Sequence, residues 1–138
     1  MSLNDAYRAY QADDLQGAAR ILERLRELTP HDAEVLLRLG QVYFKLGRRR
    51  DAQGCFQEAV RLDPEQWSGP AWEGITECRL ASDKNERTQT FLASCRAFLE
   101  RATAEYERHG RLEDAERCRS RVPSIEDRTV VVAYGWVG

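Results

Sequence analysis

Several features that usually reveal chemistry in a sequence are scarce or missing in this chain of 138 residues. It has two histidines, His31 and His109, one methionine and two lysines. No apolar run approaches the roughly 20 residues that a membrane-spanning helix needs. The four cysteines form no CxxC pair, and each lies in a helical pattern beside apolar neighbours. We therefore predict small buried thiols, no metal site and no insertion into a membrane.

The motifs of common catalytic sites are also absent. No GxSxG, HExxH, Walker-type or GxGxxG sequence occurs in the chain. Acidic pairs such as Asp13-Asp14 and Glu113-Asp114 fit solvated turns and the first turns of helices, where the helix dipole favours negative charge. We predict no catalytic residues, no cofactor and no enzymatic activity.

Charge of one sign is not in excess, since the formal net charge is -2. A chain with this balance has no basic field that would hold nucleic acid. The one basic run, Arg48 to Arg50, is followed directly by Asp51, which favours a solvated turn. The first residues show no basic segment followed by an apolar one, so no secretory signal is expected. The sequence therefore predicts a cytoplasmic protein without a nucleic-acid partner.

What the sequence does contain is an internal repeat with a period of about 34 residues. Such a period, with small residues at fixed places, indicates stacked helical hairpins. The small residues lie where two helices cross closely, and the large ones fill the gaps between helices. The pairs that match one period apart are Ala18 and Ala52, Leu22 and Phe56, Pro30 and Pro64, and Gly40 and Gly74.

The clearest unit runs from Ala33 to Pro64. Its first half places apolar residues on one helical stripe, Gly47 breaks the helix, and the second half carries a facing stripe. This unit resembles a tetratricopeptide repeat. The residues at the signature places of that family are Leu36, Leu39, Gly40, Tyr43, Gly47, Ala52, Phe56, Ala59 and Pro64.

The resemblance implies an all-α, right-handed superhelix of about three hairpins with a C-terminal capping helix. The boundaries predicted here are units of about 1–30, 31–64 and 65–109, a cap at 110–122, and an extended tail at 123–138.

The pattern also predicts individual helices. In the first unit they run from about Leu3 to Asp13 and from Leu15 to Leu28. A long helix covers about 86–109 and ends at Gly110, and a short one covers Leu112 to Arg121. The segment from Tyr106 to Cys118 repeats the turn of the clearest unit, so a degenerate fourth unit remains open.

The resemblance also implies that the first helices line a concave groove, which receives an extended peptide or a partner's helix. Side chains off the packing stripes should face it. The predicted groove residues are Tyr7, Tyr10, Gln11, Leu37, Arg38, Gln41, Phe44, Lys45, Ala71, Ile75, Cys78 and Arg79. A subset of the family binds the C-terminal carboxylate of chaperone tails through a clamp of Lys, Asn and Arg. This chain has Leu37, Gln41 and Tyr7 at clamp places, which disfavours that role.

The chain ends in TVVVAYGWVG, an uncharged segment that favours extended backbone. Left free, it would be prone to aggregate, so we expect it to be covered. It could occupy the groove of its own chain or of a sister molecule, belong to a further part of the protein, or be a disordered end. The side chains predicted to form a clasp are Val130, Val132, Tyr134 and Trp136.

These expectations favour a protein-binding adaptor whose partner is a peptide or helix in the groove. Two alternatives remain open. One is a self-assembly module whose tail joins identical subunits into a homo-oligomer. The other resembles bacterial secretion chaperones, which use three such repeats to shield an apolar segment of a client.

Overall fold

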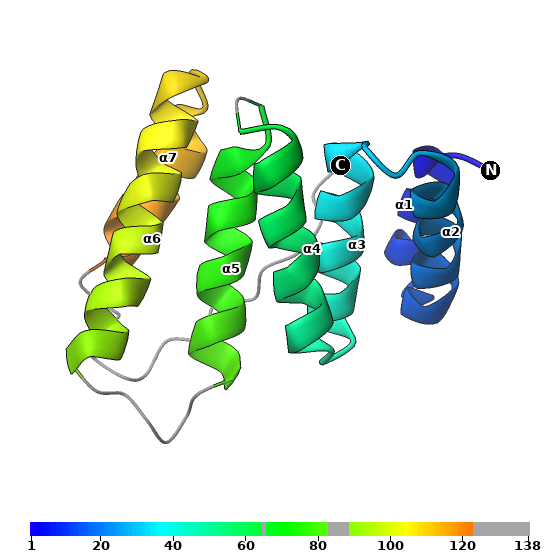
Figure 1. The fold of residues 1–138 in the computed structure, drawn as a ribbon, viewed down its shortest axis with the longest axis horizontal. Coiled ribbons are helices and arrows are strands. Elements are labelled where there is room, and N and C mark those ends of the chain that lie inside the picture. The colour runs from blue at the N-terminus through cyan, green and yellow to red at the C-terminus, as the bar shows by residue number, and fades with distance from the viewer. Residues whose placement is uncertain (65, 83–88, 123–138) are drawn as a thin grey trace.

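The computed structural model describes residues 1–64, 66–82 and 89–122. Within these ranges the chain forms seven α-helices and no strand, which confirms the all-α prediction. The helices follow one another along the molecule, with α1 and α2 at one end and α6 and α7 at the other (Figure 1). They are α1 (Leu3–Gln11), α2 (Leu15–Leu28), α3 (Ala33–Lys45), α4 (Arg49–Leu62), α5 (Ser68–Ser82), α6 (Gln89–Arg108) and α7 (Leu112–Arg121).

Tight turns of the same kind join α1 to α2, α3 to α4, and α6 to α7. Each turn has one residue with positive φ: Asp13 at 62°, Gly47 at 82° and Gly110 at 72°. The next residue donates its backbone N–H to a carbonyl five residues back, at 2.9 Å in all three turns. Glycine adopts this left-handed conformation without steric cost, and Asp tolerates it better than most residues. The turn between α6 and α7 therefore repeats that of the clearest unit, as its sequence indicated.

Small residues let adjacent hairpins approach each other closely. The ring of Phe56, which is fully buried on α4, lies between Gly40 of α3 and Gly74 of α5. An added Cβ would come within 2.8 Å of the ring at Gly40 and within 2.6 Å at Gly74. The separation of these glycines by one repeat period thus reflects one aromatic side chain packed between two helix backbones.

Helix boundaries agree closely with expectation for α2 and α7, whereas α1 ends at Gln11, two residues earlier than predicted. The described part of the long helix begins at Gln89, and positions 86–88 of the prediction lie outside the described residues. The proposed tail at 123–138 also lies outside them, and the division into units remains a prediction. None of the described helices is long and apolar enough to span a bilayer.

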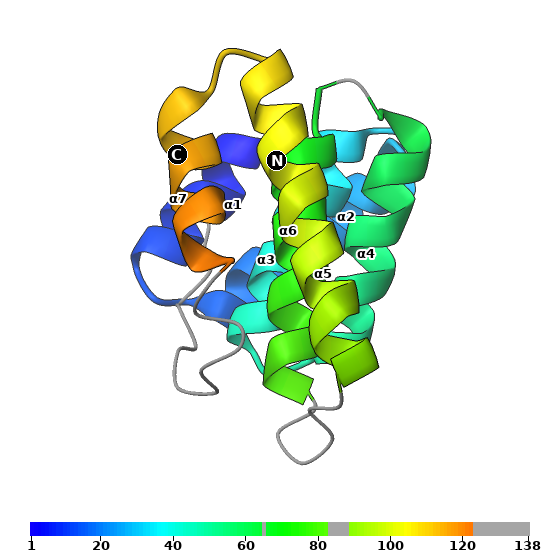
Figure 2. The same ribbon diagram turned by 90° about the vertical axis from the view of Figure 1, so that its left-hand side faces the viewer.

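Viewed along the row, α1, α3 and α7 lie on one side, and α2 and α4 lie on the other (Figure 2). The main core joins α1 to α5 and includes Leu22, Leu39 and Phe56. A second cluster, centred on Leu99 and Tyr106, joins α6 to α7. Trp72 of α5 packs against both clusters, so the row is continuous through α5.

Candidate partner-binding site

Seven of the predicted groove residues retain contact with solvent. Gln11 and Lys45 are exposed, and the other five are half-buried. The seven are Tyr7, Tyr10, Gln11, Arg38, Phe44, Lys45 and Arg79.

The other five predicted groove residues lie in the interior. Each is at most 3 % exposed, so the expectation that they face a partner needs correction. Since α3 packs against α2, α4 and α5, nine of its thirteen residues are buried. The same crowding applies to α5 between α4 and α6. The five are Leu37, Gln41, Ala71, Ile75 and Cys78.

Within the seven, two side chains occupy equivalent places in successive hairpins. Tyr10 and Phe44 are one repeat period apart and both are half-buried. Each is followed by an exposed polar residue, Gln11 and Lys45. We call these four residues the aromatic surface. The third hairpin does not continue it, because Cys78 is buried there.

The two arginines among the predicted groove residues are oriented by neighbouring side chains. Arg38 lies 5.6 Å from the ring centroid of Trp67 and donates to Gln41 Oε1 at 3.2 Å. Arg79 lies 5.0 Å from the ring centroid of Phe98 and donates to Ser94 Oγ at 2.9 Å. Arg79 therefore points toward α6. Such cation–π contacts are worth about 0.5–1 kcal/mol at exposed sites and more when desolvated.

The basic run at the α3–α4 turn has a local role. Arg48 donates to Asp51 Oδ2 at 2.9 Å and lies 4.2 Å from the ring centroid of Tyr43. Burial and a hydrogen bond to Glu23 raise the pKa of Tyr43 to about 12. Tyr43 therefore stays neutral and donates to Glu23 Oε1 at 2.8 Å.

Sequence reasoning missed a buried ionic cluster between α5 and α7. Glu73 of α5 is 1 % exposed and accepts hydrogen bonds from Tyr106, Arg117 and Cys118. The Arg117 contacts measure 2.7 and 3.0 Å. One helical turn further on, Glu77 is fully buried and forms an ion pair with Arg121.

Burial raises the pKa of Glu77, and the charge of Arg121 opposes this shift only in part. Burial likewise raises the pKa of Cys78 to about 12 and that of Cys55 to about 11. These two thiols therefore stay protonated. All four cysteines are buried, which confirms the prediction of small buried thiols.

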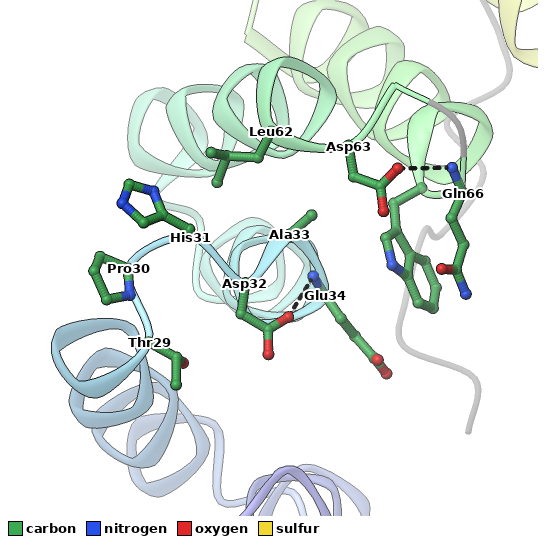
Figure 3. Close-up of a pocket in the computed structure, with 10 residues that line it drawn as sticks. Thr29, Pro30, His31, Asp32, Ala33, Glu34, Leu62, Asp63 and Gln66 are labelled. Carbon is green, nitrogen blue, oxygen red and sulfur yellow. Dashed lines mark hydrogen bonds between the residues drawn. The ribbon is translucent and has the colours of Figure 1, made fainter.

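A shallow hollow of about 660 Å³ lies where the α2–α3 and α4–α5 connections come together (Figure 3). Two of its carboxylates accept hydrogen bonds from nearby backbone N–H groups. Asp32 Oδ1 accepts from the N–H groups of Glu34 and Val35 and caps α3, while Asp63 Oδ1 accepts from the N–H of Gln66. Across the described ranges, no group of three or more His, Cys, Asp or Glu residues is arranged to hold a metal ion.

Comparison with known proteins finds a matching family, a relative in sequence and a similar solved structure. A family model described as "Tetratricopeptide repeat" matches residues 9–76. Over 78 residues, the chain is 30 % identical to "Protein CTR9 homolog" of Arabidopsis thaliana. That match covers 56 % of this chain but only 7 % of the relative's length. The solved structure titled "Crystal structure of MamA" aligns with a TM-score of 0.55 and 19 % identity, over 88 % of this chain and 74 % of that one. This structural likeness concerns the fold alone.

Proposed function

The chain is a tetratricopeptide repeat protein, and we propose that it is a non-enzymatic scaffold that binds a peptide or a helix of a partner protein. Repeats of this family commonly serve protein–protein interaction. The observation that carries the proposal is the aromatic surface, in which Tyr10 and Phe44 recur at the period of the repeat. Beside them, Gln11 and Lys45 provide a polar rim.

An aromatic centre with a polar rim suits protein binding. Aromatic side chains are enriched at interfaces, where truncation of a central one often costs about 2 kcal/mol or more. Tyr10 and Phe44 pack against the main core and are only half-buried, so part of each ring is open to contact with a partner.

The test is a paired substitution, Tyr10→Ala with Phe44→Ala. We expect at least a tenfold loss of affinity for a partner first isolated with the unaltered chain, measured by calorimetry. Leu28→Ala is the matched control, because Leu28 is apolar and 64 % exposed at the end of α2, outside the aromatic surface. Unchanged affinity in the paired variant, with its helical circular dichroism retained, would refute this binding surface.

A second candidate function is self-assembly through the tail, suggested by the sequence TVVVAYGWVG. The predicted clasp lies outside the described residues. Light scattering of the full chain and of a Tyr134→Asp, Trp136→Asp variant tests it. An oligomer that becomes a monomer in the variant supports self-assembly, and a monomer in both samples rejects it.

A further inference from the structure

The third hairpin differs from the second at two positions that face neighbouring helices. Glu73 and Glu77 follow Leu39 and Tyr43 by one repeat period, so carboxylates replace an apolar and an aromatic side chain. A buried carboxylate destabilises a fold unless it is paired. Here α7 supplies the partners, because Arg117 and Arg121 are also four residues apart and lie on the same helical face.

Apart from these arginines, α7 packs on α6 through small buried side chains. Its start matches that of α4, with Ala115 and Cys118 in place of Ala52 and Cys55. The match ends at the next residue, where α4 buries Phe56 and α7 exposes Arg119. The buried residues of α7 are Ala115, Cys118 and Arg121. Two small side chains gain little from burial, so the ionic contacts carry much of the specificity.

The carboxylates of Glu73 and Glu77 differ in how many hydrogen bonds they accept. Glu73 accepts several hydrogen bonds, as described above. Glu77 Oε1 pairs with the guanidinium of Arg121, whereas Oε2 has no hydrogen-bond partner within the described part of the chain. An incompletely satisfied buried charge favours a ligand that satisfies it better.

We propose that Glu73 and Glu77, with Tyr106, form an acidic binding site, here called the seat, for a helix that bears two arginines one turn apart. In this proposal α7 occupies the seat and competes there with a partner helix of the same chemistry. The proposal rests on the proposed scaffold function, since it names a kind of partner. It adds a second contact region on α5, where the aromatic surface ends. In the resting chain α7 fills that region.

The test uses a labelled peptide of residues 109–122 and the full chain carrying Arg117→Glu and Arg121→Glu. In this variant the tethered α7 is repelled from the seat, and the peptide should bind. In the unaltered chain, α7 competes at an effective concentration on the order of millimolar, so the peptide should bind at least tenfold more weakly. A peptide carrying Arg117→Gln and Arg121→Gln should also bind the variant at least tenfold more weakly.

Arg119→Glu is the matched control, because Arg119 is an exposed arginine of α7 that pairs with Glu116 and Glu107. It should leave α7 in the seat and block the peptide, as the unaltered chain does. Hydrogen exchange reports whether α7 has left the seat. If the double variant loses its helical signal, Arg117→Gln with Arg121→Gln replaces it.

Three results would overturn the proposal. In the first, the α7 amides stay protected in the Arg117→Glu, Arg121→Glu variant and in its glutamine replacement. In the second, they lose protection but the peptide does not bind. In the third, the glutamine peptide binds as well as the arginine peptide. Each result leaves the aromatic surface untouched, so the scaffold function is judged separately by Tyr10 and Phe44.

Discussion

Single residues determine how closely the hairpins stack. Phe56 can lie between α3 and α5 only because Gly40 and Gly74 present no side chain to its ring. Elsewhere on α4, Gly54 has open space, with no atom within 4 Å of an added Cβ. Replacing a glycine inside a helix by alanine can therefore destabilise the fold at Gly40 and stabilise it at Gly54.

We predict that Gly40→Ala lowers the free energy of unfolding by about 1–2 kcal/mol. Forcing a methyl group against the ring costs about 1–3 kcal/mol, of which the better helix propensity of alanine returns up to about 1. Gly54→Ala, the control, should raise the free energy by about 0.5–1 kcal/mol. Urea denaturation measures both. A stabilised Gly40→Ala would mean that the ring moves aside freely.

At the scale of elements, α7 shows what a local pattern reveals and what it omits. Gly110 and the residues after it predicted a helix from Leu112 to Arg121, and the structure confirms these bounds. The pattern did not predict that α7 also contacts α5, because Glu73 lies far from α7 in the sequence. The place of Glu73, one repeat period after Leu39, was the signal that could have identified it.

The ion pair of Glu77 and Arg121 gives a prediction for this element. Glu77→Met or Arg121→Met alone should destabilise the fold by about 3 kcal/mol, because each leaves a buried charge without its partner. The double substitution should be neutral or stabilising by about 1–4 kcal/mol. Thermal unfolding of all four chains gives the coupling energy. Additive effects of the single changes would show that the two groups do not interact.

The start of α7 gives a prediction about pH. Burial acts to raise the pKa of Asp114, but a hydrogen bond from Arg117 and the charge of Arg111 outweigh it and hold the pKa below its ordinary value of 3.8. Because the pKa of Asp114 is lower in the folded chain, its carboxylate stabilises the fold. This stabilisation is complete above pH 3.8 and disappears as the pH falls through the folded pKa.

Asp114→Asn should therefore destabilise the chain at pH 7 and have a smaller effect at pH 2.5. Since Asp114 is partly exposed, we expect less than about 1 kcal/mol at pH 7. Urea unfolding at both pH values tests this. An equal difference at both would exclude the carboxylate charge as its cause.

At the scale of the whole molecule, sequence reasoning succeeded where contacts are local or periodic. The turn at Gly47 and the bounds of α2 depend on neighbours in the chain, so their patterns sufficed. Leu37 and Ile75 were expected on a surface, but their burial depends on several helices packing at once. Spacing along one helix does not contain that information.

A row of helices in which neighbours support one another should be most stable at its centre. We predict the slowest amide exchange in α3 and α4, and faster exchange in α1 and α7. Exchange measured by mass spectrometry on the full chain tests this order. Equal protection across all seven helices would indicate one fully cooperative unit.

The two joints on either side of the second hairpin should respond differently to load. At the joint between α4 and α5, the Phe56 ring obstructs sliding because Gly40 and Gly74 hold it from both sides. Across the joint between α2 and α3, Leu22 packs in the core, and the polar contacts of Glu23 with Tyr43 and Arg48 can re-form after a small displacement. Bending should therefore concentrate between the first and second hairpins. Such bending would change the distance between Tyr10 and Phe44, so the first two hairpins could adapt to partners of different size. The joint between α4 and α5 would stay rigid.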